Sequence, residues 1–458
     1  MMALKKSLFC FLCGALLCLG ACSSDNTVSS PDIGSSSSGG GNISSSGGGS
    51  PSNVALADGA NAAFAQNAYG LFMSYHFTTM ENETSVYPTL GAEYDVVFAN
   101  YKPAGRIVWS TQSNTGYKNL CAVENATVPE MTYRGCTVSE GIGYGMLLSY
   151  FQGDDDTFVR LWNYSRAFRT YNHTNLTPWI TLSFHYKTGD NSSATDADLD
   201  IATALILQYY RTGNMDYLAD AMVIANALWD EEINPSNNLI YSGNTGMWTS
   251  PSITPVYNLS YFSPVALRLF AELDKNHNWA GVLDAMYQYM QDMQAKGTGV
   301  FPDWSTADLQ SIEPPNKAAG NAVRGYTYFT FNKESVRIPW RIAWDYYWYQ
   351  DERAKAVLSK LNEFIVGKSG GDPNSIALAT NYSWDLTLGA DISENSVTPT
   401  QWLAAWCATG IAGNKAWLNA CTDAVNQKTP SNNGSSYFPD ILLALYSQML
   451  NGMFLRPF

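Results

Sequence analysis

Residues 197–230, ADLDIATALILQYYRTGNMDYLADAMVIANALWD, hold two apolar stretches whose hydrophobic residues recur with helical periodicity. The turn at 211–215 (Arg-Thr-Gly-Asn-Met) separates them, so the segment predicts two helices that pack as a hairpin. Similar short joins occur at 275–277 and 410–414. The same pattern predicts helices over 60–75, 139–152, 156–169, 197–211, 215–230, 261–274, 278–295, 337–349, 352–366, 398–411, 413–425 and 437–450.

This succession of helices indicates an all-α fold. Strands that alternate with helices, as in a parallel sheet, are not visible in the pattern, which argues against a TIM barrel or a doubly wound fold. About twelve helices in hairpins are typical of an (α/α)6 toroid. No second linker rich in Gly, Pro or Ser follows residue 55, so we expect one domain over residues 55–458.

The composition excludes some functions. Forty acidic against 26 basic residues give the 458-residue chain a net charge of −14, which argues against binding of nucleic acid. Only 14% of residues are charged, whereas 14 Trp, 28 Tyr and 19 Phe supply many aromatic rings. Such rings can stack on sugars, although any single aromatic residue is more often part of a core.

The N-terminus has the features of an export signal. Lys5 and Lys6 precede an apolar run, 7–19, that is of signal-peptide length. Leu19-Gly20-Ala21-Cys22 resembles the bacterial lipobox, so we expect a lipoprotein signal peptide over 1–21 and lipid on Cys22. An ordinary secretory signal that happens to precede a cysteine is the alternative.

Residues 22–54 are rich in Ser and Gly and predict a flexible tether. We expect the protein to be a monomer anchored to the bacterial outer membrane or cell surface, in contact with the membrane through its N-terminal lipid only.

Four cysteines lie beyond Cys22. They form two local pairs, Cys121 with Cys136 and Cys407 with Cys421, each closing a loop of about 15 residues. Because neither pair has the spacing of zinc ligands, we expect two disulfides. The sequence predicts no metal site and no cofactor.

Two carboxylate motifs begin predicted helices. Glu140 lies in Ser139-Glu-Gly-Ile-Gly-Tyr-Gly-Met146, where three glycines suggest a backbone that leaves room for a ligand beside the carboxyl group. Asp196, Asp198 and Asp200 lie within five residues at the start of another helix. Ordinary structural alternatives exist for both motifs, because helix dipoles favour acids in the first turn. The second motif turns helical at once, unlike an EF-hand calcium loop.

A third motif, residues 334–347 (Glu-Ser-Val-Arg-Ile-Pro-Trp-Arg-Ile-Ala-Trp-Asp-Tyr-Tyr), places two arginines beside two tryptophans and a glutamate. Together the three motifs resemble glycoside hydrolase family 8, the endoglucanase, xylanase and chitosanase family. Segments 105–108, 258–264 and 301–304 are similar to further family segments, in the expected order.

The resemblance implies an (α/α)6 barrel and inverting endo-hydrolysis of a β-1,4-linked polysaccharide. Glu140 matches the general acid, and Asp196 matches the aspartate that grips the sugar at the cleavage point. Expected substrate-binding residues are Tyr144, Trp179, Asp198, Trp304, Arg337, Trp340 and Arg341.

The sequence departs from the family at the general base. The usual segment is Tyr-Asp-Ala-x-Arg, whereas the same register here is Lys333-Glu-Ser-Val-Arg337. Glu334 is therefore the expected base, with a side chain one methylene longer than that of aspartate. Other branches of the family use a carboxylate from an inserted loop. Segment 303–326 is a candidate for such a loop, with Asp308 and Glu313 as alternative bases.

Plant glucan or xylan is the favoured substrate, and chitosan is an alternative within the family. A surface lipoprotein that binds carbohydrate without cleaving it is a different class of function. A polysaccharide lyase on the same scaffold is a third, but it needs a cluster of His and Arg that the four histidines do not indicate.

Overall fold

The computed structural model describes residues 56–86, 97–109, 136–181, 191–245, 255–310, 330–384, 386, 391–392, 399–431, 436–454 and 456. The predicted signal peptide and tether, with Cys22, lie outside these residues. Residues 50–458 group by their contacts into one unit. Among the described helices, none has the length and apolar character needed to cross a bilayer.

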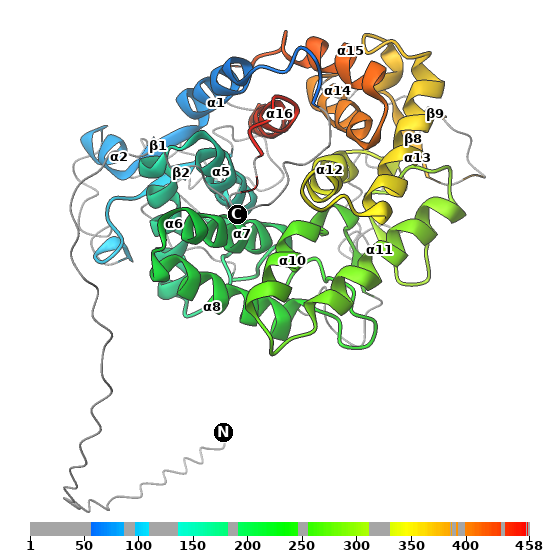
Figure 1. The fold of residues 1–458 in the computed structure, drawn as a ribbon. Helices are drawn as coiled ribbons and strands as arrows, with labels where there is room; N and C mark the ends of the chain where they lie inside the picture. Colours follow the sequence, from blue (N-terminus) through cyan, green and yellow to red (C-terminus); the bar gives the residue numbers. More distant parts are fainter. Residues whose placement is uncertain are drawn as a thin grey trace, which may run out of the picture. The chain divides into compact units, whose positions relative to one another are not determined.

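Six helices form a closed inner ring, visible in Figure 1. Each packs against the next, and the last packs against the first, which closes the ring. Buried residues occupy nearly all faces of these helices, as expected for helices enclosed by others. The inner ring comprises α5 (Ser139–Gln152), α7 (Thr195–Thr212), α10 (Pro264–Leu273), α12 (Ile338–Tyr349), α14 (Pro399–Ala408) and α16 (Tyr437–Leu450).

Among the described residues, six longer helices form a second, outer layer around this ring (Figure 1). Five of them follow an inner helix in the chain and pack against it as a hairpin, whereas α1 packs against α16, the last inner helix. The outer helices are α1 (Ala62–His76), α6 (Asp155–Asn172), α8 (Met215–Glu232), α11 (Trp279–Lys296), α13 (Glu352–Ser369) and α15 (Lys415–Val425). The predicted (α/α)6 toroid is therefore confirmed.

The twelve predicted helices begin and end within three residues of the observed bounds, and two of the differences involve a 3-10 turn. Helix α10 begins at Pro264, not at 261, because proline favours the first turn of a helix, and a 3-10 turn, η3 (Leu259–Tyr261), precedes it. The predicted helix 398–411 ends as α14 at Ala408 and continues as the 3-10 turn η7 (Thr409–Ala412). A short helix, α2 (Met80–Val86), was not predicted.

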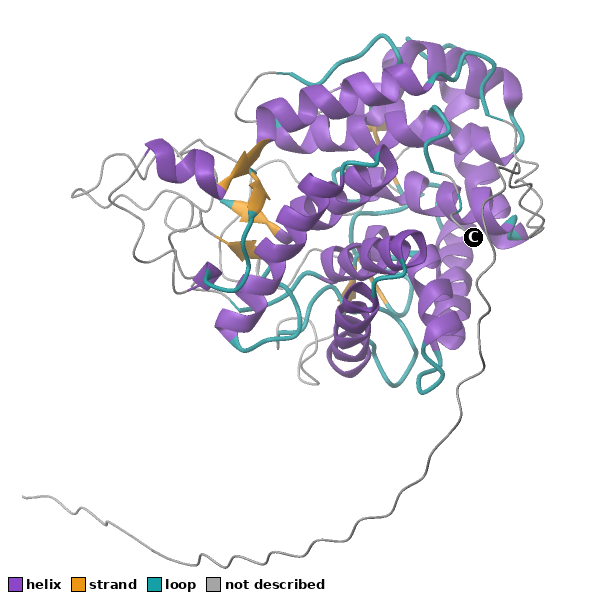
Figure 2. Ribbon diagram, turned by 60° about the vertical axis from the view of Figure 1, so that its left-hand side comes forward, coloured by secondary structure: helices purple, strands orange, loops and turns teal. Residues whose placement is uncertain are grey.

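Short antiparallel strands precede several helices of the inner ring, and Figure 2 shows them in orange beside the longer helices. Several of them lie in the segments that lead into those helices; β3, for example, runs directly into α5. The pairs are β1 (Phe77–Thr79) with β2 (Gly105–Ile107), β3 (Thr137–Val138) with β4 (Ile180–Thr181), β5 (Val256–Tyr257) with β6 (Ser305–Thr306), and β8 (Asn381–Ser383) with both β7 (Thr330–Phe331) and β9 (Asp391–Ile392).

The glycines of the Glu140 motif serve packing between elements. A Cβ atom on Gly143 would lie 2.9 Å from the Cβ of Asp200 and 3.0 Å from the carbonyl oxygen of Ala197, both on α7. A Cβ on Gly145 would lie 2.8 Å from Leu161 of α6. The expectation that these glycines leave room for a ligand was wrong, because neighbouring helices fill that space.

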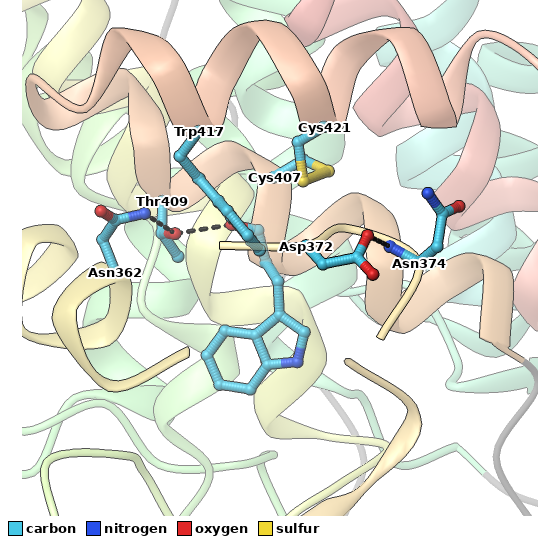
Figure 3. Close-up of a disulfide and its surroundings, with 8 residues drawn as sticks. Asn362, Asp372, Asn374, Cys407, Thr409, Trp417 and Cys421 are labelled. Carbon is cyan, nitrogen blue, oxygen red and sulfur yellow. Dashed lines mark hydrogen bonds between the residues drawn. A yellow bond between two sulfur atoms is a disulfide. The ribbon is translucent and has the colours of Figure 1, made fainter. Parts of the chain in front are cut away.

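One predicted disulfide joins α14 to α15. Cys407 and Cys421 are bonded, with 5.2 Å between their Cα atoms, and both are fully buried (Figure 3). Thr409, after α14, accepts a hydrogen bond of 3.0 Å from Asn362 of α13, so three helices are tied together here. Cys136 is also disulfide-bonded, and its expected partner, Cys121, lies outside the described residues.

Removal of this disulfide should weaken the fold. The bond closes a loop with a sequence separation of 14. Replacing both Cys407 and Cys421 with alanine is therefore expected to lower the free energy of unfolding by about 3 kcal/mol, through loop entropy. Urea denaturation measures the change. An unaltered midpoint and slope would contradict the expectation.

Candidate active site

The first turns of four inner helices meet at one end of the ring. Side chains from the starts of α5, α7, α12 and α16 contact one another, so these helices run in the same direction. Helix N-termini carry partial positive charge, which favours carboxylates beside them. The residues closest to this meeting point are Glu140, Asp196, Arg337 and Tyr437.

Arg337 lies at the centre of the cluster, just before α12. Its Nη1 donates to Glu140 and, over 2.9 Å, to Oδ2 of Asp196. Its Nη2 donates to Oε2 of Glu334. One guanidinium therefore holds all three predicted catalytic carboxyl groups, which come from positions far apart in the sequence.

A second ion pair lies one helical turn further along α12. Arg341 donates to both carboxylate oxygens of Asp200, over 2.7 and 2.8 Å. Both side chains are buried, and this two-point geometry is among the stronger kinds of hydrogen bonding in proteins. Arg341 thus fixes α12 against α7, and it is placed to support the site from within the ring.

Glu140 has the environment of a proton donor. Its Oε1 accepts a hydrogen bond of 2.9 Å from the Tyr437 hydroxyl, and 14% of its side chain is exposed. Burial raises the pKa of Glu140 above its ordinary value, although Arg337 and Tyr437 oppose that shift. A carboxyl group with a raised pKa keeps its proton at a higher pH, as a general acid requires.

Asp196 is more deeply buried, with 2% of its side chain exposed. Burial raises the pKa of Asp196 to about 8, and nearby Glu140 adds to the shift while Arg337 opposes it. Its Oδ1 has no hydrogen-bond partner among the described residues. An orphaned buried oxygen is costly to leave unpaired, and here it is available to a hydroxyl donor on a ligand.

Glu334 is the most exposed of the three acids, at 28% of its side chain. Asn258 donates to Oε2 over 2.6 Å, and Arg337 donates to the same oxygen. No described residue bonds Oε1. One oxygen therefore positions the carboxylate and the other stays available.

Asp303 fixes the segment that carries Glu334. Its Oδ1 accepts backbone N–H bonds from Asn332 and Ser335, over 3.0 and 2.9 Å. Burial and the neighbouring Glu334 raise the pKa of Asp303 to about 7. Asp303 is the first residue of segment 303–326, the candidate source of an alternative base. It is buried, however, and it bonds to the backbone of the turn that carries Glu334.

The proposed alternative bases are not part of this cluster. Asp308 is exposed and accepts a hydrogen bond from the hydroxyl of its neighbour Thr306. The backbone beside it binds Lys296, at the end of α11. Glu313 lies outside the described residues.

Three predicted substrate-binding residues are corrected by their burial. Asp198 is fully buried and accepts the backbone N–H of Thr177 over 2.9 Å, so it anchors the segment before α7. Tyr144 and Trp340 have no exposed surface and pack edge to face, with ring centroids 5.6 Å apart. A sugar cannot stack on either ring.

The two remaining predicted aromatic contacts are less buried than Tyr144 and Trp340. Trp179 is half-buried, and its carbonyl oxygen accepts the N–H of Ser139, next to the acid, over 2.9 Å. Trp304, at 9% exposure, follows Asp303. Both remain predicted sugar contacts.

Sequence reasoning missed two groups that touch the carboxylates. Asn258, which binds Glu334, lies in a segment noted only for its family resemblance. Tyr437, which binds Glu140, starts the last inner helix and has no local motif. Only the three-dimensional closure of the ring places it near residue 140.

A metal is not indicated by these side chains. Within the described ranges, no group of three His, Cys, Asp or Glu residues is arranged to hold a metal ion. Arginine occupies the position between the carboxylates instead.

The double ring of helices and the carboxylates gathered at its end together define a class, the (α/α)6 glycoside hydrolases. Residues 124–387, more than half of the chain, match the family described as glycosyl hydrolases family 8. The chain belongs to this family.

Individual relatives agree with that assignment. Endoglucanase 2 of Ruminiclostridium josui is 30% identical over 324 residues, which cover 69% of this chain and 64% of that protein. The chain thus spans less than two thirds of that relative's length.

Two solved structures share the fold. They are a β-1,3-1,4-glucanase from Paenibacillus sp. X4 (TM-score 0.65, 20% identity, covering 88% of this chain and 99% of that one) and Rex8A from Paenibacillus barcinonensis complexed with xylose (TM-score 0.64, 18% identity, covering 86% and 93%).

The Tyr437 contact predicts a change in pH dependence. Its hydroxyl stabilises ionised Glu140 and so lowers the pKa of that group. Tyr437→Phe removes this effect, so the pKa of Glu140 rises and the protonated acid persists to higher pH. The alkaline limb of kcat/KM should therefore move upward in pH, while kcat falls because Glu140 loses a positioning contact.

Tyr446→Phe is the matched control. Tyr446 lies on the same helix, but its hydroxyl binds the carbonyl oxygen of Val336, over 2.6 Å, and not Glu140. The control should leave the alkaline limb in place. A downward shift of the limb in Tyr437→Phe would contradict the assigned contact.

Proposed function

We propose that this protein hydrolyses internal β-1,4 bonds of plant glucan or xylan with inversion at the anomeric carbon, as a monomer on the bacterial cell surface. The observation that carries the proposal is the arrangement of Glu140 and Glu334 on separate nitrogens of one guanidinium, Arg337. One carboxyl group has a raised pKa, and the other has an unbonded oxygen.

In this mechanism Glu140 donates its proton to the glycosidic oxygen as the bond from that oxygen to the anomeric carbon breaks. The free oxygen of Glu334 accepts a proton from a water molecule, whose oxygen attacks the opposite face of the sugar. The two carboxyl groups of an inverting enzyme lie about 6.5–9.5 Å apart, which leaves room for that water. The product has the α configuration.

Asp196 is proposed to hold the sugar at the cleavage point. Its unpaired Oδ1 accepts a sugar hydroxyl, while Arg337 fixes Oδ2. That hydroxyl is bound only when the ring is seated between the acid and the base, so the contact helps to distort the ring toward the transition state.

The names of the relatives support glucan or xylan. One is called an endoglucanase, one is a β-1,3-1,4-glucanase and one was solved with xylose. A panel of carboxymethylcellulose, lichenan, xylan and chitosan tests the proposal. Release of reducing sugar from a glucan or from xylan, with no rise in ultraviolet absorbance, is expected. Absence of release from all four polymers would favour a binding protein, and a rise in absorbance would favour a lyase.

Surface attachment rests on the proposed lipid at Cys22. Cys22→Ser is expected to move the protein from the membrane fraction to the soluble secreted fraction, with activity intact, because the tether separates the lipid from the folded domain. Fractionation followed by the hydrolysis assay measures both. Retention of the variant in the membrane fraction would contradict lipidation at this residue.

A further inference from the structure

A cavity of about 470 Å³ lies beside α6 and α8, away from the Arg337 cluster. Its volume is within the range of about 300–1,000 Å³ that is typical of small-molecule sites. The lining includes Tyr101, Arg166, Arg169, His173, Asn175 and Asp220. Nothing in the catalytic mechanism uses these residues.

Arg166 is the distinctive group in this cavity. Its guanidinium carbon lies 4.4 Å from the ring centroid of Trp162 and 5.2 Å from that of Tyr101. It has no hydrogen bond or close ion pair with any described residue. The two aromatic rings contact the face of the guanidinium, so the N–H groups at its edge remain available to a ligand.

The nearby acid is already engaged. Oδ2 of Asp220 accepts hydrogen bonds from Arg169, over 2.6 Å, and from the Trp162 indole, over 2.7 Å. The cavity lining therefore has two arginines against one aspartate, in a chain whose net charge is −14. Such a local excess of positive charge suits an anion.

The other polar groups suit a sugar. Tyr101 and Thr170 bond to each other through their hydroxyls, over 2.7 Å, and Thr170 is exposed. The Asn175 amide can both donate and accept hydrogen bonds. The N–H edge of Arg166 can bind a carboxylate, and the surrounding hydroxyl and amide groups can bind sugar hydroxyls. The combination suits a sugar that carries a carboxylate.

A short segment connects this cavity with the catalytic acid. Four Cα–Cα steps separate Asn175 from Trp179, so the two residues lie at most about 14 Å apart. Thr177 within it is held by Asp198, and Trp179 binds the backbone of Ser139, next to Glu140. A polymer in the active site is thus within reach of the cavity.

We propose that this cavity is an accessory binding site for uronic acid units, with Arg166 as the carboxylate ligand. This inference rests on the proposed function, because it assumes that the protein binds a polysaccharide. It extends that function by naming acid-substituted chains, such as a xylan with glucuronyl branches, as the polymers that the protein retains.

The test uses the full chain with Glu140→Gln, so that bound polymer is not consumed. Its affinity is measured by calorimetry for 4-O-methylglucuronoxylan and for the same polymer with its carboxyl groups reduced to alcohols. Adding Arg166→Gln should weaken binding of the acidic polymer about tenfold, the effect of losing one charge-assisted hydrogen bond. Binding of the reduced polymer should not change.

Arg160→Gln is the matched control, because Arg160 lies on the same helix and pairs with Asp156 and Glu81 outside the cavity. It should leave both affinities unaltered, and thermal melting checks that each variant is folded. Equal affinity for acidic and reduced polymer, or an equal loss in both arginine variants, would overturn the proposal. Hydrolysis of lichenan and unsubstituted xylan by the Arg166→Gln protein with Glu140 intact tests the proposed function separately, and it should match the wild type.

Discussion

Glu140→Gln is expected to reduce turnover on an unactivated polysaccharide by about 10²–10⁴-fold, the usual contribution of a general acid. Glutamine keeps the size and polarity of the side chain and can still bond to Tyr437, but it cannot deliver a proton to the leaving oxygen. Affinity for oligosaccharides should stay close to normal. Initial rates of reducing-sugar release and calorimetric binding measure the two quantities.

Glu352→Gln serves as the control for this variant. Glu352 also lies in the first turn of a helix, but that helix is α13 in the outer ring, and 81% of its side chain is exposed. Its replacement should not change the rate. If Glu140→Gln retains more than a tenth of the wild-type rate, the proton donor is another residue.

Glu334→Ala is expected to abolish hydrolysis and to allow azide to act in its place. The methyl side chain cannot accept a proton from water, and the vacated volume admits a small anion that attacks without a base. Because attack occurs on the face opposite the leaving oxygen, the product should be an α-glycosyl azide. Nuclear magnetic resonance identifies its configuration.

Variants of the alternative bases, Asp308 and Glu313, are the comparison for Glu334→Ala. Asp308→Ala and Glu313→Ala should hydrolyse polysaccharide at near-normal rates if Glu334 is the base. Near-normal hydrolysis by Glu334→Ala, with loss in either loop variant, would transfer the role to the loop and leave Glu334 as a structural partner of Arg337.

Much of this architecture could be predicted from the sequence, because a toroid is built from local hairpins. Each hairpin depends on periodic apolar residues and a short polar join, such as 211–215, and both features are visible within 40 residues. Arg337 and the acids it binds were also predictable, since each lies in a short motif at a helix start.

The groups around those acids were harder to predict. Inner helices are buried on all faces, so hydrophobic pattern does not show which face lines the site. For that reason the sequence does not distinguish Tyr144 and Trp340, which belong to the core, from aromatic residues that contact sugar. Tyr437 was missed because its contact with Glu140 joins residues 297 positions apart.

That separation also sets an order of assembly in time. A chain that is exported N-terminus first, as the proposed signal peptide implies, presents Glu140 outside the cytoplasm before Tyr437. Helix α16 packs against α1, α5 and α14, so those helices lack a buried neighbour until α16 is in place. The apolar interior of the unfinished ring is exposed during this interval, when the chain is most prone to aggregate, and the acid acquires its hydroxyl neighbour only when the ring closes.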